Sequence, residues 1–140
     1  MANQITTQIR QTSAATSEAT IRTHKILIDR PTAKGGEDQG PMGGELFLAA
    51  IGGCFISNLL AAIKAREANI SGVHAAVIGT LEDAPSRFTA VELVVSANYT
   101  DPELFAKLVD IAERGCIMVN TLRGKLDLSV RIGALEKEPA

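Results

Sequence analysis

The sequence predicts a single α+β domain over residues 1–140, in which antiparallel sheets wrap around one long buried central helix. Between Leu46 and Ile63 only Ser57 and Asn58 are polar, so a helix formed there is apolar on every side. The segments before and after this stretch alternate in polarity or carry β-branched residues, which is typical of strands. The chain has no repeated βαβ pattern, which argues against a parallel doubly wound sheet.

An apolar helix of about eighteen residues is either a membrane span or the core of a globular domain. The segment 44–69 is rich in Ala and Gly, has Ser57 and Asn58 midway, and is followed by strand-like segments with polar faces. We therefore expect a buried helix and no membrane association. One sheet and one further helix hardly cover such a helix, so we expect an intimate homodimer.

The elements before the central helix are short. Residues 3–11 are expected to form an edge strand and residues 18–29 one or two more strands, with Ile26 and Ile28 facing inward. Residues 30–44 contain two of the five prolines and five of the twelve glycines, which indicates a loop. This loop has neither GxGxxG nor GxxxxGK[ST], so a lid or connector is favoured over a phosphate-binding loop.

After the central helix, residues 73–82 and 88–99 are expected to pair as a hairpin, the second strand having one apolar and one polar face. Residues 101–103 (DPE) have the cap, proline and acid of a helix start. Apolar residues then recur at helical spacing, so Cys116 is predicted to lie on the apolar face of a second helix. Gly124 ends that helix, and the residues that follow it, up to Ile132, alternate as a last strand. We expect the final five residues (EKEPA) to fray.

Composition narrows the possible functions. Charged residues make up 21% and hydrophobic ones 46%, as in ordinary soluble proteins, and a net charge of −2 without a basic run predicts no nucleic-acid partner. The first ten residues lack the basic and apolar regions of a signal peptide, so we expect a cytoplasmic protein with reduced thiols. With two cysteines, no CxxC pair, and only His24 and His74, neither a metal site nor a cofactor is expected.

Two cysteine-bearing segments resemble one protein family. Gly40–Cys54 (GPMGGELFLAAIGGC) resembles the helix-opening segment of the OsmC/Ohr family, whose P-x-x-x-E-L-L-L-A-A-L-G-G-C-like pattern carries the reactive cysteine. Arg114–Leu122 (RGCIMVNTL) is similar to the family's second cysteine motif, C-P-V-x-x-T/A-L. His24, Asp29 and Pro31 also match the H-x-x-x-x-D-x-P pattern of the OsmC-like branch. The resemblance covers nearly the whole chain.

The resemblance implies an OsmC-like fold, an intertwined homodimer and a thiol-dependent peroxidase site at the subunit interface. Cys54 matches the peroxidatic cysteine, Cys116 the resolving cysteine, and Glu45 the carboxylate that holds an activating arginine. In such a site a hydroperoxide, preferably an organic one, converts Cys54 to a sulfenic acid. Cys116 then closes a disulfide, and an external thiol or dithiol reductant restores both thiols.

The chain departs from the family pattern in two places. Ile117 replaces the proline that usually follows the second cysteine, and Gly115 is the residue that can supply flexibility there instead. The turn after the first strand, SAAT, lacks the arginine that organic hydroperoxide resistance proteins carry at this point. Arg10, Arg22 and Arg30 are the candidates to replace it.

Glu45 precedes Cys54 by nine residues, which is about 13.5 Å of rise and about 900° of rotation on a straight helix. The two side chains then lie on opposite sides of the helix. We therefore expect Glu45 to act on the cysteine of a partner chain, unless Gly52 and Gly53 kink the helix sharply.

A structural interpretation stands beside each of these roles. A free cysteine often only fills volume in a core, and a first-turn glutamate is favoured by the helix dipole alone. The alternative function is a non-enzymatic protein that binds an apolar ligand at the dimer interface, with Cys54 and Cys116 as core residues. The consumption of thiols by an alkyl hydroperoxide distinguishes the two functions.

Overall fold

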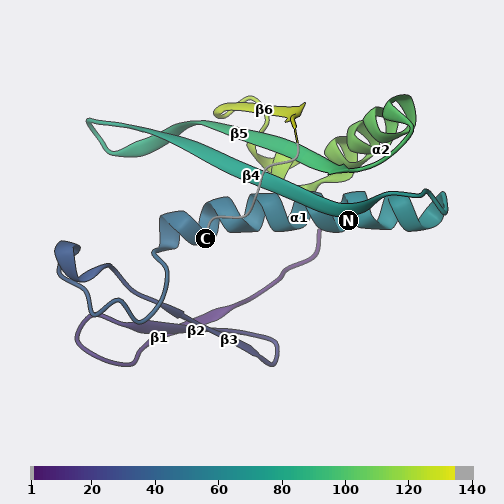
Figure 1. Cartoon of the computed structure of the whole chain (residues 1–140). Helices are drawn as coiled ribbons and strands as arrows, with labels where there is room; N and C mark the ends of the chain where they lie inside the picture. The colour runs from purple at the N-terminus through teal and green to yellow at the C-terminus, as the bar shows by residue number, and fades with distance from the viewer. Residues whose placement is uncertain (1, 135–140) are drawn as a thin grey trace. The chain divides into compact units, whose positions relative to one another are not determined.

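The computed structural model describes residues 2–134, and the predicted frayed tail lies outside them. Two compact units make up the chain; the first ends at Phe47 and the second begins at Leu48. Figure 1 shows the element order, which is strands, long helix, hairpin, helices and strand; the sequence predicts the same order with one helix after the hairpin. The strands are β1 (Gln8–Gln11), β2 (Ser17–Ile21), β3 (His24–Ile28), β4 (Ser71–Glu82), β5 (Arg87–Asn98) and β6 (Asp127–Ile132). The helices are η1 (Thr32–Lys34), α1 (Gly43–Ala65), α2 (Pro102–Gly115) and α3 (Ile117–Leu122).

The first unit is an antiparallel sheet in the order β1-β2-β3. Within its described residues, Ala19 is the only buried apolar side chain, so the sheet has almost no core of its own. Ile26, which the sequence analysis placed inward, is 36% exposed because so little of this unit covers the sheet.

The loop between β3 and α1 is fixed by one buried carboxylate. Asp29 accepts hydrogen bonds from Thr16 Oγ1 at 2.8 Å, Arg30 N at 2.6 Å, Gln39 N at 3.2 Å and Glu37 N at 3.3 Å. Burial alone raises the pKa of Asp29, but these four donors outweigh it and hold the pKa below the usual 3.8. The predicted loop is therefore an ordered segment.

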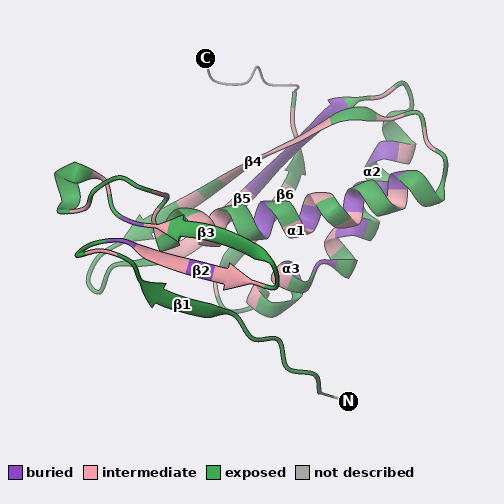
Figure 2. Ribbon diagram, turned by 90° about the horizontal axis from the view of Figure 1, so that it is seen from below, coloured by how far each residue is buried: buried purple, intermediate pink, exposed green. Residues whose placement is uncertain are grey.

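Helix α1 buries one side of its circumference. Ile51, Phe55, Leu59 and Ile63 recur every four residues and are buried, while Leu60 is 50% exposed. Figure 2 shows buried and exposed residues alternating along α1. The helix has the length and composition of a membrane span. Within the single chain one side of the helix stays exposed, as expected for an apolar helix that one sheet and one further helix hardly cover.

The second unit contains the sheet β4-β5-β6. β4 and β5 are antiparallel, whereas β6 runs parallel to β5, from the pair Ala90↔Asp127 to the pair Val95↔Ile132. The expectation of purely antiparallel sheets is therefore wrong for this sheet. The helical segment between β5 and β6 carries the chain back to the start of β5, and such a crossover produces a parallel pair.

β5 is the central strand of this sheet, and its predicted polar face is only partly exposed: Asn98 is exposed and Glu92 is intermediate. Val91, Leu93 and Val95 are buried as expected, but Val94 and Ser96 on the other face are buried too. Side chains on both faces of a central strand can be buried, and the alternation of polar and apolar residues in its sequence does not reveal this.

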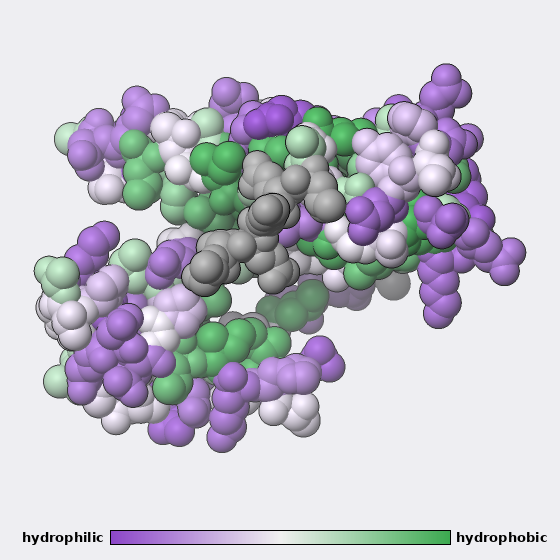
Figure 3. All heavy atoms as spheres, viewed as in Figure 1, coloured by the Kyte–Doolittle hydropathy of each residue, from purple (hydrophilic) through white to green (hydrophobic). Residues whose placement is uncertain are grey.

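Apolar side chains also reach the surface of both units. The most exposed ones are Ile5, Ile9, Leu60, Ile78, Leu81 and Ile117, each with at least half of its surface accessible. Apolar surface is visible in each unit in Figure 3.

Candidate active site

The two cysteines lie in the second unit, on separate segments that are 62 positions apart in the sequence (116 − 54). Cys54 is half-buried in the middle of α1, and Cys116 is fully buried between α2 and α3. Both are free thiols. The fold therefore places both candidate redox residues in the same unit, and both are reduced.

Cys116 does not lie inside a continuous second helix, as the sequence analysis expected. It ends α2 and precedes α3, and its backbone is extended, with φ −79° and ψ 118°. The apolar spacing predicted one helix because it continues across this break. The corner forms without the proline of the family motif, since Ile117 follows the cysteine and Gly115 precedes it. Ile117 itself is 69% exposed.

The side chains of Cys116 and Cys54 lie near each other. Burial raises the pKa of Cys116, and the hydrogen bond and negative charge of Cys54 raise it further. The backbone N–H groups of Val119 and Met118 oppose this rise only in part. Cys116 therefore keeps its proton to a higher pH than an ordinary thiol does.

Asn58 connects the backbones of the two cysteine segments. Its Nδ2 donates to Cys54 O at 3.2 Å, within α1, and to Gly115 O at 3.4 Å, at the end of α2. The sequence analysis noted Asn58 only as an interruption of the apolar run. Its position four residues after Cys54, on the same side of a helix, was the available signal.

Glu45 lies in the first turn of α1, in the first unit. Its Oε1 accepts a hydrogen bond from Met42 N at 2.8 Å, so it satisfies one of the free N–H groups at the start of the helix. This is the contact expected of an ordinary first-turn carboxylate. The proposed role of Glu45 at the cysteine of a partner chain stays a prediction.

The three candidate arginines also belong to the first unit. Arg10 Nη2 lies 3.0 Å from Glu18 Oε1 on the exposed side of the sheet. Arg22 has a positive φ of 56° in the β2–β3 turn. Arg30 lines a pocket of about 490 Å³ in this unit, together with Lys34 and Asp29.

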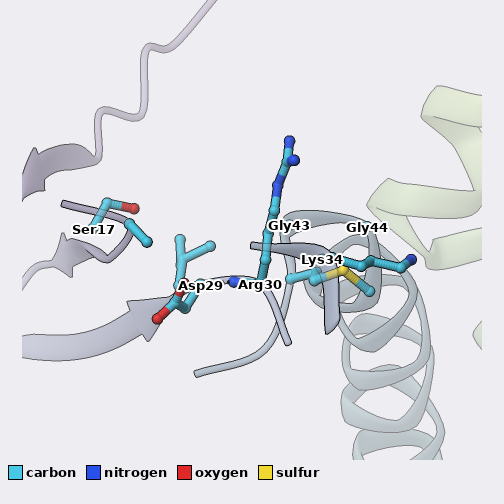
Figure 4. Close-up of a pocket in the computed structure, with 9 residues that line it drawn as sticks. Ser17, Asp29, Arg30, Lys34, Gly43 and Gly44 are labelled. Carbon is cyan, nitrogen blue, oxygen red and sulfur yellow. Dashed lines mark hydrogen bonds between the residues drawn. The ribbon is translucent and has the colours of Figure 1, made fainter. Parts of the chain in front are cut away.

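Figure 4 shows this pocket, with the Arg30 side chain extending away from the Asp29 carboxylate. Neither cysteine lines the pocket. Among the residues that the structure describes, no group of three or more His, Cys, Asp or Glu residues is placed to hold a metal ion.

Comparison with solved structures places this architecture among known folds. An OsmC-like protein from Mycoplasma pneumoniae has a TM-score of 0.82 and 17% identity, and the match covers 97% of this chain and 100% of that one. An organic hydroperoxide resistance protein OsmC from Legionella pneumophila has a TM-score of 0.72 and 21% identity, covering 94% and 99%. The organic hydroperoxide resistance protein OhrB of Bacillus subtilis has a TM-score of 0.68 and 21% identity, covering 92% and 98%.

A search among curated proteins found no significant match. The family model for OsmC-like proteins matches residues 36–131, which include both cysteines. In this soluble fold the apolar helix α1 is the core helix. The chain therefore belongs to the OsmC-like protein family.

Proposed function

We propose that the chain is a thiol-dependent peroxidase that reduces organic hydroperoxides, with Cys54 as the peroxidatic and Cys116 as the resolving cysteine. The observation that carries the proposal is the proximity of the two thiols, which lie on different segments and are both reduced. Membership in a family that includes hydroperoxide resistance proteins supports it.

The first step is attack by the Cys54 thiolate on the distal oxygen of the hydroperoxide. An S–O bond forms and the O–O bond breaks, so that Cys54 becomes a sulfenic acid and the alkoxide takes a proton to leave as an alcohol. The fully buried Ile51 and Phe55 belong to the same stretch of α1. Such apolar surroundings favour an alkyl hydroperoxide over hydrogen peroxide.

The second step is attack by the Cys116 sulfur on the Cys54 sulfenic sulfur. The S–S bond forms, the S–O bond breaks, and the hydroxide leaves as water with the proton that Cys116 carried. The raised pKa of Cys116 fits this role, because the resolving thiol keeps its proton while Cys54 reacts first. Two equivalents of an external thiol, or one of a dithiol, then reduce the disulfide.

The proposal includes a homodimer whose partner chain supplies the charged groups that activate Cys54. The exposed side of α1 and the sheet of the first unit, which has almost no core, both support a second chain. Glu45 and one of Arg10, Arg22 or Arg30 are the proposed contributors.

Thiol loss after mixing with cumene hydroperoxide tests the function. The wild type is expected to lose both thiols rapidly for each peroxide consumed. Cys54→Ser is expected to lose none rapidly, and Cys116→Ser to lose one and to accumulate sulfenic and then sulfinic acid. If the wild type reacts no faster than free cysteine does, the peroxidase proposal is wrong and the apolar-ligand binder becomes the better explanation.

A further inference from the structure

Asn58 has a contact pattern that the proposed reaction does not yet explain. It is one of two polar residues between Leu46 and Ile63, and its side-chain amide donates to a carbonyl on each cysteine segment. Cys54 O already lies in the hydrogen-bond ladder of α1, so the first bond only adds to an occupied acceptor. The bond to Gly115 O connects α1 to the corner that carries Cys116.

This second bond gives a hydrogen-bond donor to a carbonyl group at the end of α2. The last carbonyls of a helix have no partner within the helix. Two asparagines supply partners here: Asn120 Nδ2 donates to Arg114 O at 3.0 Å, and Asn58 Nδ2 donates to Gly115 O at 3.4 Å. Asn120 belongs to α3, so its bond stays within the α2–α3 corner, whereas the bond from Asn58 crosses to α1. Both side-chain amides therefore donate to neighbouring carbonyl groups at the end of α2, but they join α2 to different elements.

We propose that Asn58 is a positioning residue that holds the Cys116 corner against the Cys54 turn and thereby sets the rate of disulfide closure. The inference rests on the proposed function, since it assigns a role within the same site. Gly115 directly precedes Cys116 in the chain, so the carbonyl that Asn58 holds is one residue from the resolving cysteine. A Cβ built at Gly115 would lie 4.0 Å from Asn58 Oδ1, an ordinary contact distance, so the two segments are neighbours.

The two chemical steps depend differently on this contact. The reaction of Cys54 with peroxide needs only one of the two segments. Disulfide closure is intramolecular, and its rate depends on how well the second sulfur is held near the first. Loss of the bridge is therefore expected to slow the second step and to leave the first unchanged.

The test is rapid-mixing kinetics with cumene hydroperoxide on Asn58→Leu, which keeps the side-chain shape and removes the donor. We expect disulfide closure to slow about five- to tenfold, the scale of one hydrogen bond, while the first step stays within about twofold. Slower closure also leaves the sulfenic acid open to a second peroxide. At high peroxide the intact mass should therefore shift from the disulfide form to the sulfinic form. If closure is unchanged, or if both steps slow equally, the inference is wrong.

Three further variants separate positioning from a general loss of structure. Asn120→Leu removes the matched amide bond within the corner and is expected to change closure less than Asn58→Leu does. Asn58→Ser retains a donor for the carbonyl four residues earlier but is too short to reach Gly115, so it should behave like the leucine variant. Asn58→Gln retains a donor that can reach both carbonyls and should recover most of the closure rate. If Asn58→Leu does not fold, Asn58→Ala takes its place in every comparison.

A second measurement does not depend on peroxide. In a buffer of oxidised and reduced glutathione, the Cys54–Cys116 pair exchanges two thiols for one disulfide, while one oxidised glutathione becomes two reduced molecules. The equilibrium constant reports the effective concentration of the two thiols, and it should fall about five- to tenfold in Asn58→Leu. An unchanged constant overturns the inference even if the peroxidase is active. A lowered constant supports it even if the wild type proves inert to peroxide.

Discussion

Asp29 is a buried carboxylate with four hydrogen-bond donors, three from the backbone of the loop before α1 and one from Thr16, just before β2. A neutral acid could satisfy fewer of these donors, because protonation turns one of its acceptors into a donor itself. The ordered conformation of this loop therefore depends on Asp29 being ionised.

This arrangement predicts a pH dependence with a definite sign. Because the pKa of Asp29 is lowered in the folded protein, its contribution to stability is complete above the unfolded value of 3.8 and is lost as the pH falls through the lower folded value. Thermal melts from pH 7 downward should show this loss in the wild type. The amide introduced by Asp29→Asn does not titrate, so that variant should melt at a lower temperature at pH 7 and lose the Asp29-specific part of the decline. Parallel curves for the two proteins would contradict the assignment.

At this scale the sequence supplied the two cysteines but not the contact that joins their segments. The family-like motifs identify Cys54 and Cys116 because reactive sulfur is rare and distinctive. Asn58 is an ordinary polar residue whose acceptor at Gly115 lies 57 positions away, and no local pattern can indicate such a pair.

At the scale of elements, Gly52 marks one of the close approaches between α1 and β4. A Cβ on Gly52 would lie 2.6 Å from Val77 Cγ2, whereas a Cβ on Gly53 would meet nothing within 4 Å. The contact between helix and sheet therefore requires a glycine at position 52 but leaves room for a side chain at position 53.

The pair gives a matched test of this contact. Gly52→Ala is expected to lower the free energy of unfolding by about 1–3 kcal/mol, because the methyl group forces Val77 or the helix to move. Gly53→Ala should raise it by about 0.5–1 kcal/mol through helix propensity. Urea denaturation measures both. Equal effects in the two variants would contradict the close approach, and a destabilised Gly53→Ala would indicate that a second chain covers that side of α1.

The elements themselves followed from local patterns better than their connections did. The apolar run predicted α1, and the cap at Asp101 predicted α2, whose Leu104 N indeed donates to Asp101 Oδ1 at 3.1 Å. The break at Cys116 and the parallel pairing of β6 were missed. Both depend on where the chain returns to the sheet, which hydrophobic spacing along one segment does not encode.

At the scale of the whole molecule, the single chain leaves apolar surface on α1 and gives its first sheet almost no core. We therefore expect light scattering to report about twice the chain mass of 14.8 kDa, and a melting temperature that rises with protein concentration. Leu60→Glu places a charge on the exposed side of α1 and should shift the mass toward one chain. Ile111→Glu is the control, since Ile111 is 38% exposed on α2. A compact wild-type species of one chain's mass would contradict the dimer.

The parallel position of β6 also has a consequence for how the protein is made. β6 is the last described strand, and it pairs along β5 from Ala90 to Val95. Until residues 127–132 leave the ribosome, one edge of β5 has no partner, and the sequence along that edge is VELVV, which is apolar except for Glu92. An unpaired, apolar strand edge is a template for aggregation. In the interval between synthesis of β5 and arrival of β6, the newly made chain therefore exposes a strand edge to which other chains can pair.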